Sequence, residues 1–99
     1  MPIHPYRGVL PRLGERVFPA PGAELVGDVQ VGDDVSFWFH TVARGDVSSI
    51  RIGDGANVRD GAVLNVGYRT HPLVVGCGVT IASTPTSAAV GGDPRERGR

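Results

Sequence analysis

The sequence lacks most features that would place a chain of 99 residues in a specialised class. Its single cysteine, Cys77, excludes an intrachain disulfide framework. No apolar run is long enough to span a bilayer, and residues 1–10 have neither the length nor the apolar centre of a secretory signal. We therefore expect a cytoplasmic protein with no membrane partner.

An excess of charge of either sign is also missing. The formal net charge is +0, and acidic and basic residues are interspersed along the chain. All ten basic residues are arginine, which is typical of a GC-rich coding sequence. Because no basic patch or stripe is present, we expect no nucleic-acid partner.

What the sequence does contain is a six-residue repeat. The phrases VGDDVS, IGDGAN and VGCGVT begin at residues 31, 52 and 75, and each has an aliphatic residue followed by glycine. Such a short fixed period predicts an all-β solenoid in which three strands form one triangular coil, with about three coils in this chain. The side chains expected to point inward are those of Leu25, Val31, Phe37, Ala43, Ile52, Val58, Leu64, Val75 and Ile81.

The repeat divides the chain into three segments. Residues 1–24 contain five prolines and predict an extended N-terminal arm, with one short strand around residues 16–18, that covers the first coil. Residues 25–82 form the predicted β-helix repeat domain, in which Ser48, Ser49 and residues 67–72 should be loops at corners. Residues 83–99 have no period and predict a non-repetitive, disordered tail.

Four segments of the repeat domain together resemble the gamma-class carbonic anhydrase family, which consists of left-handed parallel β-helix proteins of the hexapeptide-repeat superfamily. These segments are SFWF from residue 36, RGDV from residue 44, IRIGD from residue 50 and NVRDGAVL from residue 57. The resemblance covers residues 1 to about 82. It implies a homotrimer that holds zinc or iron through three histidines at each subunit interface, and the reversible hydration of carbon dioxide, a small-molecule substrate, to bicarbonate.

The positions at which this family carries its metal ligands hold other residues here. The resemblance places the three ligands at Asn65, Ser83 and Ala88, and none of these is histidine. An amide, a hydroxyl and a methyl group cannot replace three neutral imidazoles, so we expect this chain to bind no catalytic metal. His71 is a weaker candidate ligand, because a histidine in a loop is more often exposed to solvent.

Other site positions match the family in part. Arg44 and Asp46 match an ion pair that bridges subunits beside the active site, although a solvated turn would have the same residues. Asn57 and Asp60 match polar residues that line the site. Arg59 stands where a glutamine would orient the substrate, which weakens a catalytic interpretation further.

Two explanations of the divergent C-terminal segment remain open. The chain is either a naturally diverged, shortened family member or the product of a reading frame that slips near Ile81, and we favour the slip. A slip would not explain Asn65, which lies upstream. Three functions follow as hypotheses: an inactive carbonic anhydrase-like protein, a trimerising scaffold subunit without enzymatic activity, and a hexapeptide acyltransferase, for which the repeats offer no suitable histidine.

Overall fold

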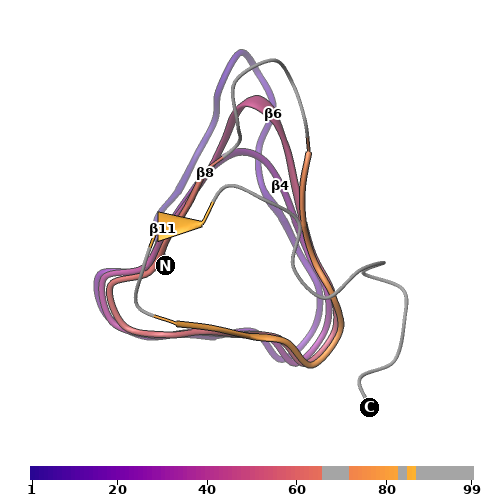
Figure 1. Ribbon diagram of the computed structural model, residues 1–99. Helices are drawn as coiled ribbons and strands as arrows, with labels where there is room; N and C mark the ends of the chain where they lie inside the picture. The colour runs from indigo at the N-terminus through magenta and orange to yellow at the C-terminus, as the bar shows by residue number, and fades with distance from the viewer. Residues whose placement is uncertain (66–71, 83–84, 87–99) are drawn as a thin grey trace.

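A computed structural model describes residues 1–65, 72–82 and 85–86, and these residues form short strands joined by tight turns. All pairings between the strands are parallel, and the chain winds into a triangular prism (Figure 1). No helix that could cross a membrane occurs in this part of the chain. The strands are β1 (Ile3–His4), β2 (Arg12–Leu13), β3 (Phe18–Pro19), β4 (Glu24–Val31), β5 (Ser36–Phe37), β6 (Val42–Ile52), β7 (Asn57–Val58), β8 (Val63–Asn65), β9 (Leu73–Val75), β10 (Thr80–Ile81) and β11 (Pro85–Thr86).

The strands stack in columns that form the three faces of the prism. The first face contains β1, the start of β4, the start of β6, then β8 and β11. The second contains β2, the ends of β4 and β6, and β9. The third contains β3, β5, β7 and β10. The fold is a left-handed parallel β-helix of about three coils, as the six-residue repeat and the family resemblance predict.

The interior of the prism is built from the residues that the repeat selects. Every inward-facing position named from the sequence is buried, from Leu25 to Ile81. On the third face, for example, Phe37, Val58 and Ile81 lie in register one above another. Burial of these side chains is the main stabilising contribution in such a fold, because each aliphatic group loses its contact with water.

Three further core residues lie outside the six-residue spacing. Val29, Ile50 and Leu73 are fully buried and pair with one another in register on the second face. Alternate residues of a strand point to the same side, so each of these joins the inward residue two positions later. The six-residue rule alone does not find them.

Several local expectations need correction. Ser48 and Ser49 lie at a corner, as expected, but they belong to a bulge within the continuous strand β6 and not to a separate loop. The N-terminal segment contains three short strands, not one near residues 16–18, and all three pair with the next coil. Pro85 and Thr86, expected in a disordered tail, form β11 and pair with β8. The second expected loop lies outside the described residues, except for Pro72, and so does the rest of the tail. The domain boundaries stay a prediction.

One corner of the prism has the same geometry in every coil, and we call it the repeated corner. It is the turn between the second and third faces, and its residues with positive φ are Arg16, Asp34, Gly55 and Gly78. In each turn after the first, a backbone N–H group donates to the coil before it, as Asp34 N does to Glu15 O and Gly55 N to Asp33 O, both within 2.9 Å. The stacked backbone thus imposes a left-handed conformation even where the residue is not glycine.

Aspartate side chains join successive turns of the repeated corner. Asp54 Oδ1 accepts a hydrogen bond from the backbone N–H of Asp33 at 2.8 Å, and Asp33 Oδ1 accepts one from the N–H of Glu15 at 2.8 Å. Arg16 donates to Asp34 across the same corner, and this hydrogen bond lowers the pKa of the Asp34 carboxyl. The GD pairs of the repeat therefore satisfy backbone donors that the turns would leave unpaired.

A second corner, between the first and second faces, differs from coil to coil, and we call it the expanded corner. Gly27 of β4 pairs with Gly45 of β6, but the next pair in register is Val29 with Ile50. Asp28 alone on β4 therefore stands opposite residues 46–49 on β6. This is a β-bulge with three extra residues, and it pushes the backbone outward at this corner.

Candidate functional site

Arg44 and Asp46 form an ion pair within this chain. Arg44 Nη2 lies 3.1 Å from Asp46 Oδ2, and the Arg44 side chain is more than half exposed at 55%. In the neighbouring coil Arg44 pairs in register with Asn65, at the end of β8. The structure thus brings together the two predicted interface residues and one predicted ligand position. Whether the ion pair also reaches another subunit stays a prediction.

Asn57 lies on a different face and takes part in a short hydrogen-bond chain. The Ser36 hydroxyl donates to Asn57 Oδ1 at 2.5 Å, and Trp38 Nε1 donates to Ser36 Oγ at 3.0 Å. These hydrogen bonds link β5 to β7, in which Ser36 and Asn57 are paired in register. Asn57 therefore has a fixed orientation, because its amide oxygen is held by the neighbouring coil.

Arg59 is engaged with an aromatic ring. Its guanidinium carbon lies 5.0 Å from the centre of the Trp38 ring, within the range of a cation–π interaction. The rings of Phe18 and Trp38 lie 5.1 Å apart with a tilt of 54°. Three coils thus contribute to one aromatic and cationic cluster, which the sequence motifs did not reveal. Asp60 is exposed in the turn that follows β7.

The described residues do not fit the metal site that the family resemblance implies. Asn65 occupies one ligand position, and its side chain offers an amide where a histidine site needs an imidazole nitrogen. Ser83, Ala88 and His71 lie outside the described residues. Over residues 1–65, 72–82 and 85–86, no group of three or more His, Cys, Asp or Glu side chains could hold a metal ion.

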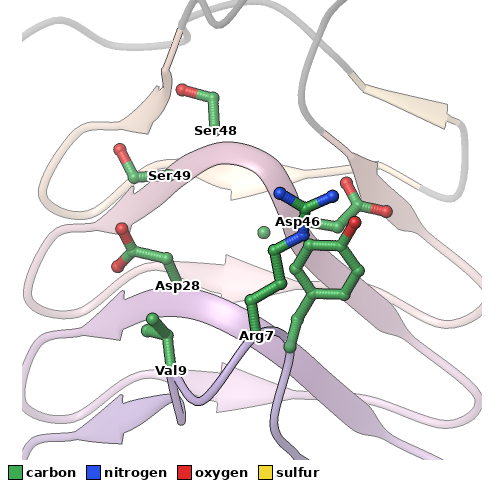
Figure 2. A pocket seen from close by; sticks show the side chains of 8 residues that line it. Arg7, Val9, Asp28, Asp46, Ser48 and Ser49 are labelled. Carbon is green, nitrogen blue, oxygen red and sulfur yellow. The ribbon is translucent and has the colours of Figure 1, made fainter.

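The expanded corner borders an open cavity of about 350 Å³. It lies between the N-terminal turn and the bulge of β6, and Figure 2 shows Arg7 rising between Asp28 on one side and Asp46 on the other. Of its two walls, the spacing of the repeat marks only the corner at Ser48 and Ser49, and no motif predicts the contact with the N-terminal turn, which is far away in the chain. The lining residues are Tyr6, Arg7, Val9, Asp28, Gly45, Asp46, Ser48 and Ser49.

Comparison with curated proteins finds relatives over most of this chain, although no family model matches it. Protein YrdA of Escherichia coli is 36% identical over 85 residues, which cover 80% of this chain and 46% of YrdA. A carbonic anhydrase of Geobacillus kaustophilus is 38% identical over 79 residues, covering 80% of this chain and 43% of the relative. Mitochondrial gamma carbonic anhydrase 1 of Arabidopsis thaliana is 36% identical over 76 residues, which cover 72% of this chain and 28% of the relative. The chain thus spans less than half the length of these relatives.

Two solved structures share the fold. A provisionally named acetyltransferase of Bacillus cereus superposes with a TM-score of 0.62 at 28% identity, covering 90% of this chain and 73% of that one. A hexapeptide transferase family protein of Anaplasma phagocytophilum superposes with a TM-score of 0.61 at 27% identity, covering 89% of this chain and 73% of that one. These matches and the repeating coils define a protein of the hexapeptide-repeat class.

The sequence relatives narrow this class. Both named carbonic anhydrases match across the region that contains the RGDV and NVRDGAVL segments, at 36% and 38% identity. The chain belongs to the gamma-class carbonic anhydrase family of hexapeptide-repeat proteins.

Proposed function

We propose that this chain is a self-associating β-helix subunit of the gamma-class family that does not form the family's metal centre. The observation that carries the proposal is Asn65, which occupies a ligand position in a described strand beside Arg44. An amide oxygen binds zinc or iron poorly compared with imidazole, so even a chain with histidines elsewhere would lack one ligand. Ser83 and Ala88 stand at the other two positions in the sequence.

The surroundings of Arg59 support the same proposal. A guanidinium held over Trp38 cannot accept a hydrogen bond, whereas the glutamine of the family pattern could accept as well as donate. A positive charge here would also oppose a metal cation. The departure at Arg59 is therefore consistent with a face that has taken a packing role.

Self-association has its own support. Large apolar side chains on the first coil and on the third face are partly exposed, and Phe18 and Phe39 remain 47% and 43% accessible. Such side chains are common at subunit interfaces. We propose a homotrimer in the cytoplasm, as the family pattern implies, with Arg44 and Asp46 at its interface.

Metal content and activity test the proposal. The purified chain is incubated with zinc or with ferrous iron under anaerobic conditions, dialysed, and assayed for bound metal and for carbon dioxide hydration, while light scattering gives its mass. We expect no stoichiometric metal, no hydration above the uncatalysed rate, and a mass above that of a monomer. Stoichiometric metal with hydration activity would overturn the proposal that the subunit is inactive. A monodisperse monomer would overturn the proposal that it self-associates.

Acyl transfer is the second candidate, because both structural neighbours carry a transferase name. A transferase of this class needs a base near the acyl acceptor, and the histidines of the described residues, His4 and His40, are exposed. His4 Nε2 lies 3.0 Å from Glu24 Oε1. We expect no release of free thiol from acetyl-coenzyme A with amine or hydroxyl acceptors, and turnover would favour the transferase.

A further inference from the structure

The cavity of the expanded corner has a rigid wall on its N-terminal side. Tyr6 and Val9 exchange two backbone hydrogen bonds of 2.9 and 3.0 Å, and Arg7 and Gly8 both have positive φ in the tight turn between them. Gly27 permits this turn to pack on β4, because a β-carbon there would lie 3.1 Å from Tyr6 Cβ and would also meet Gly45 O. The backbone of Arg7 is therefore fixed at the rim of the cavity.

The two carboxylates that line the cavity are each balanced by an arginine. Asp28 Oδ1 accepts a hydrogen bond from Arg51 at 3.0 Å, and Asp46 Oδ2 accepts one from Arg44 at 3.1 Å. Arg7 is different, because within the described part of the chain it forms no ion pair, and its guanidinium lies 5.5 Å from the centre of the Tyr6 ring. With both carboxylates paired, Arg7 supplies the uncompensated charge of the cavity.

We propose that this cavity binds a small carboxylate-bearing molecule. The Arg7 guanidinium lies over the Tyr6 ring without an ion-pair partner among the described residues, and the N–H groups of such a guanidinium can donate to both oxygens of a carboxylate. The Ser49 hydroxyl lines the same cavity and can donate a further hydrogen bond. A volume of about 350 Å³ is at the small end for ligand sites, which suits a ligand of a few heavy atoms.

The proposal does not depend on the absence of a metal centre. Its site lies on Arg7 of the N-terminal turn and on the bulge of β6, and Asn65 is not among the described residues that line the cavity. Binding of a carboxylate can therefore be measured on the full chain whatever the outcome of the hydration assay.

Amide chemical shifts of the full-length, ¹⁵N-labelled chain provide the test. Acetate, malonate and inorganic phosphate are titrated separately at constant ionic strength, with chloride as the control anion. We expect saturable shifts with acetate and malonate, centred on Tyr6 to Val9 and on residues 45–49, with dissociation constants in the millimolar range. Arg7→Gln should weaken binding roughly tenfold or more, because hydrogen bonds to charged groups contribute more than neutral ones.

Arg12→Gln is the matched control, since Arg12 is exposed on β2, outside the cavity, and its loss changes the net charge equally. We expect it to leave both dissociation constants unchanged. A second variant, Ser49→Asp, places a carboxylate in the cavity and should abolish binding even if Arg7→Gln fails to fold.

Three results would overturn the proposal. One is the absence of saturable shifts with acetate and malonate, and another is equal binding by the wild type and by the folded Arg7→Gln or Ser49→Asp chain. Tighter binding of phosphate than of either carboxylate would contradict the assignment of the ligand class.

Discussion

The repeated corner and the expanded corner of the prism use opposite solutions to the same problem. At the repeated corner every coil turns with one residue of positive φ, from Arg16 to Gly78, and the turns hydrogen-bond to one another. At the expanded corner Asp28 of one coil stands opposite residues 46–49 of the next. Identical turns stack in register and hydrogen-bond to one another, whereas the difference in length between adjacent coils opens the cavity beside Arg7.

This difference indicates where such a fold can acquire a binding site. The repeated corner cannot change in one coil without losing hydrogen bonds to two others. The expanded corner is already irregular, so extra residues cost little there, as for loops generally. We therefore expect large stability effects at the repeated corner and large binding effects at the expanded corner.

The largest effect should come from Gly32→Ala, in the approach to the repeated corner. A β-carbon at Gly32 would meet Asp54 Oδ1 and would lie 2.9 Å from Asp54 N. The Asp54 carboxylate would have to move and release the Asp33 N–H that it accepts. We expect a loss of about 2–4 kcal/mol in the free energy of unfolding, measured by urea denaturation. A loss below about 0.5 kcal/mol would show that the aspartate contacts do not hold the corner.

Gly55→Ala should have the next largest effect, for a purely conformational reason. Gly55 has φ +74°, and the nearest atom to an added β-carbon is 3.9 Å away, so there is no steric overlap. A left-handed backbone costs an alanine about 1–2 kcal/mol. As a control, Gly55→Asn should cost less, since asparagine tolerates this conformation better. Equal losses for both variants in urea denaturation would contradict the conformational explanation.

Thr41→Val tests the corner between the third and first faces. The Thr41 hydroxyl is buried and, in the described structure, has no hydrogen-bond partner. Replacing it by a methyl group should stabilise the chain by about 1 kcal/mol. On folding, an unpaired buried hydroxyl loses its hydrogen bonds to water and gains none in the protein. The expected rise in melting temperature is about 4–8 °C for a domain of this size. Thr80→Val, at an exposed position of β10, is the control and should cause little change.

Removing residues 47–49 would leave one residue of β6 at the expanded corner, which is the number that β4 has there. Asp46 would then stand directly opposite Asp28, as Gly45 already stands opposite Gly27. We expect a change in the free energy of unfolding within about 1 kcal/mol, since a shorter loop and a new like-charge contact act in opposite directions. The same deletion should abolish carboxylate binding in the amide titration. Retained binding would mean that the cavity does not depend on the bulge.

The smallest effect should come from titration of Asp34 at the repeated corner. The hydrogen bond from Arg16 lowers the pKa of Asp34 in the folded chain below the value of about 3.9 expected when unfolded. The contribution of the Arg16–Asp34 pair to the free energy of unfolding is therefore complete above about pH 5. It is lost as the pH falls through the pKa of Asp34 in the folded chain. The difference in melting temperature between the wild type and Arg16→Gln should be small at pH 7, because the pair is exposed, and should vanish in acid. A difference that grows in acid would contradict this.

Much of the architecture could be predicted from the sequence, and particular residues show where that ability ends. The six-residue spacing correctly places Val31, Ile52 and Val75 in one interior column. It misses Val29 and its partners, because they follow the two-residue alternation of a longer strand. The positive φ of Arg16 and Asp34 also escapes prediction, since those residue types do not demand it and the stacked turns impose it.

The candidate site was less predictable than the fold. Sequence motifs select Arg44 and Asp46 as an ion pair that bridges subunits; the structure shows an ion pair between them within the chain, and the bridge stays a prediction. The motifs place Arg59 where a glutamine would orient the substrate, but they do not predict that its guanidinium lies over Trp38. The interruption of the repeat at Ser48 and Ser49 marks the corner where the bulge lies, but no motif predicts that Arg7 meets it there.

The amino-acid order alone determined which side chains face the axis of the prism, since that property depends only on local period and residue type. Tertiary structure decided which side chains meet across coils, including Arg59 with Trp38 and Arg7 with the bulge of β6. The physical reason is that contacts between coils depend on the number of residues in each turn and on the register of pairing. Those quantities are set by the stacking of the whole chain and not by any single repeat.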